Sequence, residues 1–196
     1  MTSNTHHGHG HHTDAIDILG FWLYIMTDCI LFASLFAAYV VLHQPQSYGP
    51  ALAPLIDLHY VLGETMFLLF SNFAFGMAMI LSYKNKKVAT SILLFITLIL
   101  GGAFIYMEIS EFIHLVHLGY KWDVSAAASA FFTLVGTHGL HVAAGLLWIL
   151  VLIVQILKMG LCQATHRRLT YLGLFWNFLD IVWIFVFTIV YLLGAV

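Results

Sequence analysis

Five long, nearly uncharged apolar segments constrain this chain more than any other feature. They cover about residues 18–42, 60–83, 88–112, 125–157 and 171–193. Each holds at least the ~20 residues that an α-helix needs to cross the hydrocarbon layer of a bilayer. Their apolar residues run on without the alternation of a transmembrane β-strand, which argues against a barrel. The sequence therefore predicts an all-α integral membrane protein, a bundle of five transmembrane helices.

The composition agrees with a membrane protein of one domain. Of the 196 residues, 62% are hydrophobic and 8% are charged, whereas about 25% are charged in soluble domains. Five spans leave no room for a second domain, so residues 18–196 are expected to form one transmembrane domain. The formal net charge of −2 gives no indication of a nucleic-acid partner.

The first 17 residues differ from the rest of the chain. They are polar, contain no Lys or Arg, and carry five histidines interrupted by glycine. This composition is typical of a flexible, solvated tail, which we expect on the cytoplasmic side. Adventitious metal binding by the histidines is the alternative, and the role of the tail stays open.

The basic residues predict an orientation in the membrane. Six of the seven lie in the second and fourth loops: Lys84, Lys86, Lys87, Lys158, Arg167 and Arg168. The positive-inside rule places these two loops in the cytoplasm. The N-terminus is then cytoplasmic and the C-terminus periplasmic. Tyrosines stand near several span ends, as in interfacial belts, at Tyr60, Tyr83, Tyr171 and Tyr191.

Several ionisable side chains fall inside the predicted spans, where each needs a partner or a role. They are Asp28, Glu64, Glu108, Glu111, His138, His141 and Asp180. No Lys or Arg lies inside any span. Histidines are therefore the natural partners of the mid-membrane carboxyls Asp28 and Asp180. Because the series of ionisable groups looks incomplete across the bilayer, structural pairing is favoured over proton conduction.

A possible metal motif occurs at the end of the third span. Glu111 and His114 form a Glu-x-x-His, which is half of the di-iron motif of bundle proteins. A di-iron site needs a second such motif and two more carboxylates, and the sequence has no second copy. Glu108 and Glu111 are also expected near the outer surface, with His138 and His141 deeper. Interhelical hydrogen bonding is therefore favoured, and no catalytic, cofactor-binding or metal-binding residue is assigned.

Three segments carry a family resemblance. The first span reads GFWLYIMTDCILF over residues 20–32, the fourth GTHGLHV over 136–142, and the fifth FWNFLDIVW over 175–183. Together they resemble subunit III of the haem–copper terminal oxidases. The five-span length and the His-rich tail resemble the short form found in bacterial cytochrome bo-type ubiquinol oxidases. One departure is Asn177, where many members have His.

The resemblance implies a supporting role without a cofactor in this chain. Haems and copper are expected in subunit I, which this subunit contacts, in a complex with subunits II and IV. Phospholipid is expected in a cleft between the helices, and the subunit is expected to support proton uptake and stability. The complex oxidises ubiquinol, reduces oxygen and pumps protons across the bacterial inner membrane. The residues expected to serve structural, lipid or subunit contacts are Asp28, Glu64, Glu108, Glu111, His114, His138, His141, Trp176 and Asp180.

Two other functions remain as alternatives. A stand-alone di-iron membrane oxidase would hold about two irons per chain. A small transporter or proton channel is less favoured, because no internal repeat is evident. The choice between ubiquinol and menaquinol, the haem types and the lipid species stay open. So does the question whether Asp28 exchanges protons or serves only the packing.

Overall fold

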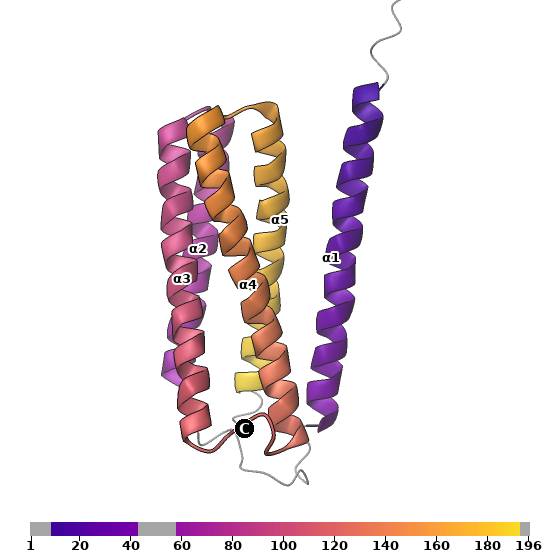
Figure 1. Ribbon diagram of the computed structural model, residues 1–196, viewed down its shortest axis with the longest axis vertical. Helices are drawn as coiled ribbons and strands as arrows, with labels where there is room; N and C mark the ends of the chain where they lie inside the picture. Colours follow the sequence, from indigo (N-terminus) through magenta and orange to yellow (C-terminus); the bar gives the residue numbers. More distant parts are fainter. Residues whose placement is uncertain (1–8, 43–57, 193–196) are drawn as a thin grey trace, which may run out of the picture.

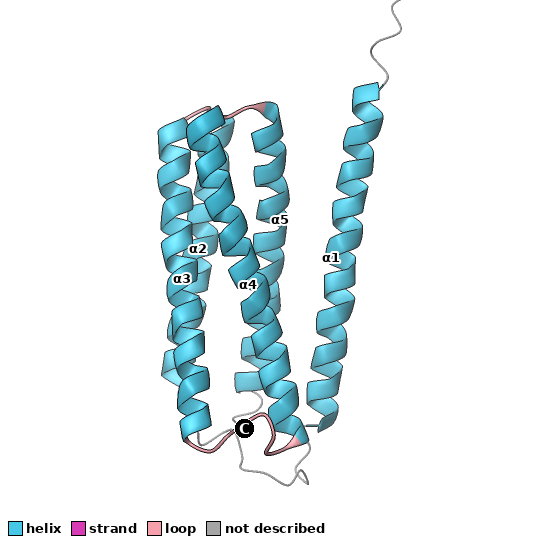
Figure 2. Cartoon of the chain, in the orientation of Figure 1, coloured by secondary structure: helices cyan, strands magenta, loops and turns pink. Residues whose placement is uncertain are grey.

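Five helices make up the part of the chain that the computed structural model describes, residues 9–42 and 58–192, with the backbone alone for 9–17. They are α1 His9–Leu42, α2 Leu58–Tyr83, α3 Lys87–His117, α4 Ala126–Met159 and α5 Gln163–Val186, and α5 continues into the π-helix η2 Phe187–Leu192. Each is long and apolar enough to cross a membrane. Figure 2 shows helices and loops, without a strand in the described ranges. The predicted all-α, five-span fold is confirmed.

The helices extend beyond the predicted spans. α1 begins at His9 rather than at residue 18, so part of the expected tail is helical, while residues 1–8 lie outside the described ranges. α3 continues past residue 112 to His117, and α5 begins at Gln163 rather than at 171. Apolar runs mark only the part of a helix that lies in hydrocarbon. Polar residues at the ends continue the helix beyond the hydrocarbon layer. The segments predicted from hydropathy are therefore shorter than the helices.

Helices α2, α3, α4 and α5 form a compact four-helix bundle, and α1 stands beside α4 and α5 (Figure 1). α4 crosses the bundle at a slant (Figure 1). Its 34 residues span roughly 51 Å at 1.5 Å per residue, more than the ~30 Å of hydrocarbon, and the slant accommodates part of the excess. The bundle core is aromatic, with Phe104, Phe131, Trp176, Trp183 and Tyr191 all buried.

Glycines let the indole of Trp176 lie between three helices. A Cβ atom on Gly145 of α4 would be 2.9 Å from Trp176 Cζ3, and one on Gly101 of α3 would be 3.2 Å from the same ring. Neighbouring Gly102 has nothing within 4 Å of such an atom. Because lipid is as apolar as a leucine side chain, close packing of this kind is a main source of helix association in membranes.

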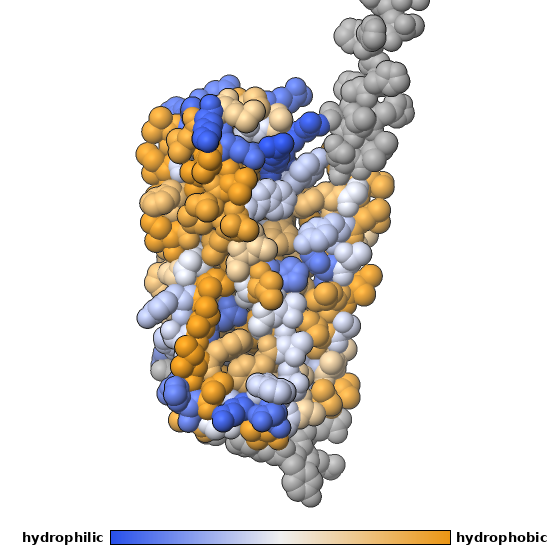
Figure 3. Space-filling view, viewed as in Figure 1, coloured by the Kyte–Doolittle hydropathy of each residue, from blue (hydrophilic) through white to orange (hydrophobic). Residues whose placement is uncertain are grey.

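The surface is divided into bands. Figure 3 shows hydrophilic side chains gathered at both ends of this face, and between them strongly apolar side chains mixed with less apolar ones. At one end, where α2 joins α3 and α4 joins α5, the basic residues make contacts across the helices. Lys87 Nζ donates a hydrogen bond to the Leu157 carbonyl at 2.9 Å, and Arg168 Nη1 donates to Gln155 Oε1 at 2.7 Å. These cations therefore belong to the bundle end and are suited to face the cytoplasm.

The orientation can be tested with reporters fused after Val196 and in the 84–86 loop. We expect a periplasmic signal for the C-terminal fusion and a cytoplasmic signal for the loop, because six of the seven basic residues lie on the loop side. The measurement is the activity of paired reporters that are active on opposite sides of the membrane. A cytoplasmic C-terminus would reject the orientation.

Candidate functional site: buried polar residues between the helices

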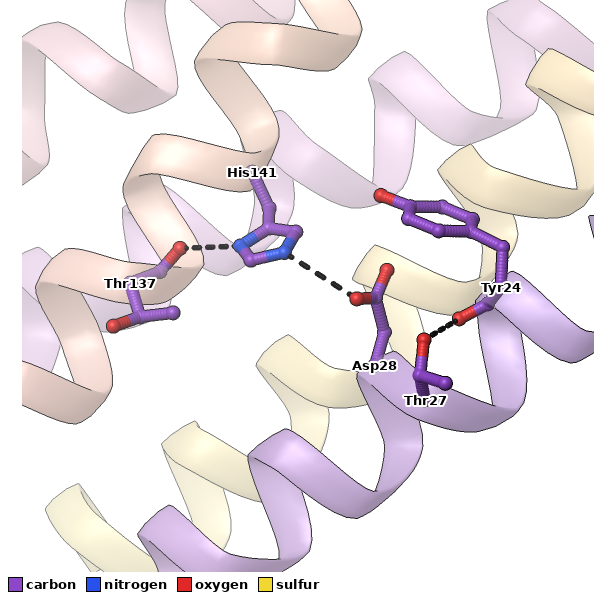
Figure 4. Close-up of polar contacts among 5 residues, drawn as sticks. All are labelled: Tyr24, Thr27, Asp28, Thr137 and His141. Atoms are coloured by element: carbon purple, nitrogen blue, oxygen red, sulfur yellow. Dashed lines mark hydrogen bonds and ion pairs between the residues drawn. The ribbon is translucent and has the colours of Figure 1, made fainter.

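Asp28 of α1 and His141 of α4 face one another across the gap between these helices (Figure 4). Asp28 Oδ1 lies 3.8 Å from His141 Nε2, and Asp28 is 6% exposed. His141 Nδ1 lies 2.8 Å from the carbonyl oxygen of Thr137. A carbonyl only accepts, so Nδ1 carries a proton in this contact. The structure thus brings Asp28 together with a histidine, as expected from the sequence.

The pair links two helices within the membrane. At 3.8 Å the Asp28 and His141 side chains are within ion-pair distance but beyond hydrogen-bond length. The contact joins α1 to α4 at the level where Phe32 of α1 also packs against the His141 ring, with centroids 5.2 Å apart.

His138 lies one turn before His141 in a different environment. It is fully buried, and its ring stacks on Trp183 with centroids 5.2 Å apart and 28° between the planes. Phe104 contacts it edge-on at 6.0 Å. Neither ring nitrogen has a hydrogen-bond partner among the described residues. Trp183 is itself anchored, because its Nε1 donates to Thr65 Oγ1 of α2 at 3.0 Å.

Three carboxyl side chains are buried on α2 and α3. Glu64 is 0% exposed, Glu108 3% and Glu111 7%. Glu111 Oε2 accepts a hydrogen bond from the Tyr191 hydroxyl at 2.9 Å. Tyr191 is therefore part of the core and not of an interfacial belt, contrary to the sequence-based expectation.

One expectation about α3 is wrong. Glu108 does not lie apart in depth from the α4 histidines, because a Cβ on Gly139, the neighbour of His138, would be 2.7 Å from Glu108 Oε1. In the Glu-x-x-His segment, which is not favoured as a metal motif, Glu111 is buried while His114 is exposed. The helix therefore directs these two side chains to different surroundings.

Asp180 of α5 has an amide partner, not a histidine. Asn72 Nδ2 of α2 donates to Asp180 Oδ2 at 3.0 Å, and Asp180 is 8% exposed. Asn72 was not predicted as the partner, because the prediction considered only ionisable side chains and the amide is neutral. Trp176, on the same helix as Asp180, is 1% exposed and packs against the glycines described above.

The donor groups do not suit a metal centre. Within residues 18–42 and 58–192, no three side chains of His, Cys, Asp or Glu are placed to hold an ion together. The histidines expected in the tail fall among residues whose side chains are not described. The described polar groups instead link helices in pairs: α1 with α4, α2 with α5, and α3 with η2.

A large apolar cleft lies between α1 and α5. Its volume is about 740 Å³, and it is lined by Trp22, Cys29 and Phe36 from α1 and by Leu174, Ile181 and Phe185 from α5, among others. Asn177, which also lines it, donates Nδ2 to the Gly173 carbonyl of its own helix at 2.9 Å. An apolar groove of this kind at the edge of a membrane bundle is suited to hydrocarbon chains.

The chain is similar to known proteins that all carry names of oxidase subunit 3 or subunit III. Residues 2–195 match the family model described as Cytochrome c oxidase subunit III. A Pseudomonas aeruginosa protein named Cytochrome bo(3) ubiquinol oxidase subunit 3 is 52% identical over 189 residues, covering 96% of this chain and 90% of that protein. Cytochrome c oxidase subunit 3 of Bacillus sp. strain PS3 is 46% identical, covering 91% and 86%. Quinol oxidase subunit 3 of Bacillus subtilis is 40% identical, covering 93% and 89%.

The pairing of Asn72 with Asp180 can be tested by a matched pair of substitutions. Asn72→Leu removes the donor to Asp180 and leaves a buried carboxyl unpaired, which costs about 1–3 kcal/mol. Asn177→Leu is the control, because this amide bonds only to the carbonyl of its own helix among the contacts described and lines the apolar cleft. We expect a lower unfolding temperature in mild detergent for Asn72→Leu than for Asn177→Leu. Equal temperatures would contradict the pairing.

Proposed function

Because the chain belongs to the cytochrome c oxidase subunit III family, we propose that it is the supporting subunit III of a bacterial ubiquinol oxidase that reduces oxygen and pumps protons. The similarity to the ubiquinol oxidase subunit of Pseudomonas aeruginosa along nearly the whole chain carries the proposal. Five helices long and apolar enough to cross a membrane, in a family that includes bacterial ubiquinol oxidase subunits, are consistent with a multi-pass protein of the inner membrane. Haem and copper belong to subunit I in this proposal.

The choice of electron donor belongs to another subunit. The relatives carry names with two kinds of donor, cytochrome c and quinol, the latter given as ubiquinol in one name, at identities between 40% and 52%. Such similar chains serving different donors indicate that this subunit does not bind the donor. Ubiquinol is proposed here from the more similar relative, and menaquinol is the alternative.

The outer surface of the helices supplies the contacts of a subunit. Large apolar side chains are exposed on all five helices, for example Leu23 and Ile30 of α1, Phe73 of α2 and Ile99 of α3. Subunit I is proposed as the main partner within the membrane, together with subunits II and IV. The cleft between α1 and α5 is proposed to hold the acyl chains of phospholipids, because its lining is almost wholly apolar.

The role proposed for Asp28 is to hold α1 to the bundle. A proton carrier needs neighbouring groups within hydrogen-bond reach. Residues 18–27 of α1, which lead from the loop-side end of the helix to Asp28, contain no Asp, Glu, His, Lys or Arg. The cleft beside them is apolar. The pair with His141 therefore contributes an attraction between helices, and it is not placed at the end of a relay along α1.

Two substitutions of Asp28 separate packing from proton exchange. Asp28→Asn retains the shape and can still contact His141, so we expect normal oxygen consumption and a normal proton-to-electron ratio. Asp28→Leu leaves the imidazole unpaired at a cost of about 1–3 kcal/mol, and subunit III should dissociate more readily in detergent. Asp123→Asn, at an exposed carboxyl, is the control. A pumping defect in an intact Asp28→Asn complex would assign Asp28 to proton transfer.

The subunit assignment is tested by purification of the chain from its own membranes in mild detergent. We expect a larger haem-bearing protein to co-purify in fixed ratio and the complex to oxidise ubiquinol with oxygen as acceptor. A chain that purifies alone with about two irons would support the di-iron oxidase instead. Proton flux through the isolated chain in liposomes would support a channel.

A further inference from the structure

The bundle half opposite the basic loops contains three buried carboxyl groups that the proposed function does not use. α2 begins at Leu58 and α3 ends at His117, so Glu64 and Glu111 lie about 9 Å from those helix ends at 1.5 Å per residue. Glu108 lies nearly one turn deeper on α3. None of the three is more than 7% exposed. The site is therefore enclosed by protein, in the half of the bundle away from the basic loops, with Glu108 as its deepest member.

The carboxyl groups are poorly supplied with partners. Glu111 accepts one hydrogen bond from Tyr191. Both oxygens of Glu64 and both of Glu108 have no hydrogen-bond partner among the described residues. The Tyr60 hydroxyl, nearby on α2, donates to the Met107 carbonyl at 3.2 Å. Four carboxyl oxygens are thus left without a donor in a place where bulk water does not reach, which is costly for any of them that carries charge.

The α4 helix packs on the same part of α3. His138 is 0% exposed, and neither ring nitrogen has a partner among the described residues. Its edge contact is with Phe104, which lies about one turn from Glu108 on α3. Its chain neighbour Gly139 faces the Glu108 carboxyl, so the missing Cβ makes room for that group. The buried Glu108 carboxyl therefore meets a glycine of α4 and no donor, and unpartnered carboxyl oxygens in a helix interface point to a small polar ligand beside them.

No cation compensates the carboxyl groups from the surrounding helices. The Lys and Arg residues of α3, α4 and α5 all lie at the opposite end of the bundle, and α2 has none. Lys121, in the loop between α3 and α4, is exposed. Of the tyrosines at this end, Tyr191 on η2 contacts Glu111, and Tyr60 on α2 bonds to the carbonyl of Met107, the neighbour of Glu108. Without a cation, protons and water are the ligands that relieve both the repulsion and the missing donors.

We propose that Glu64, Glu108 and Glu111 form a proton-holding site that contains internal water and exchanges with the membrane surface at the C-terminal end of the chain. A carboxylate that takes a proton from water becomes a carboxyl group. Its O–H then donates to a water or to an oxygen of the neighbouring carboxyl group, which supplies a donor that the helices lack. No other atom changes its bonding, so the site stores protons and releases them unchanged. The proposal does not depend on the identity of the partner subunits.

Infrared spectroscopy of the intact complex tests the site, because a protonated carboxyl group has a C=O band distinct from that of a carboxylate. We expect a protonated-carboxyl band near neutral pH that shifts in D₂O and that loses intensity in both Glu64→Gln and Glu111→Gln. Asp123→Asn is the matched control, since this exposed carboxyl lies in the loop at the same end. If a variant fails to assemble, Glu108→Gln replaces it, and the D₂O shift is measured on the unmodified complex.

Three results would overturn the proposal. One is the absence of a protonated-carboxyl band near neutral pH. Another is a band that all three Gln variants leave intact, which would place the proton elsewhere. The third is a band that stays unshifted after prolonged exposure to D₂O, which would exclude exchange with water.

Discussion

The structure depends on the demand of the bilayer that every backbone polar group be paired within the protein. Five helices meet this demand, but they do not by themselves attract one another, because lipid chains solvate apolar side chains as well as a neighbouring helix does. The association of α2 to α5 must therefore come from close fit and from polar contacts. Trp176 between Gly101 and Gly145 provides the close fit.

Polar contacts give the bundle its specific arrangement. Ser71 Oγ donates to the Thr97 carbonyl, which joins α2 to α3, and Trp183 Nε1 donates to Thr65 Oγ1, which joins α5 to α2. Asn72 with Asp180 adds a second link between α2 and α5. Each contact gives a hydrogen-bond partner to polar groups that lipid chains cannot bond. A helix shifted along or around its axis would therefore lose several of these hydrogen bonds at once. This is the reason why polar residues inside a non-catalytic membrane subunit need not belong to a reaction centre.

The sequence predicted the five helices because their apolar runs are longer than any soluble helix requires, and it predicted a histidine partner for Asp28. It misplaced Glu108 because depth was judged from a span end at residue 112, whereas α3 continues to His117. Depth depends on the true helix end, which hydropathy does not mark. It also missed Asn72 and the role of Tyr191, since neutral donors are common and only their position opposite a carboxyl reveals them. Which side chains meet across two helices depends on how each helix is rotated about its axis and tilted. A single sequence does not determine either.

The attachment of α1 differs from that of the other helices. Phe21 contacts Tyr171 of α5 at 5.0 Å, Phe32 contacts the His141 ring at 5.2 Å, and Asp28 faces His141. Between these contacts the apolar cleft separates α1 from α5 over much of their length. One face of α1 is thus packed on the bundle, with Phe32 and Tyr39 in the buried core. The other face, toward α5, leaves the apolar cleft, which is the part of this interface that we propose to be filled by hydrocarbon chains.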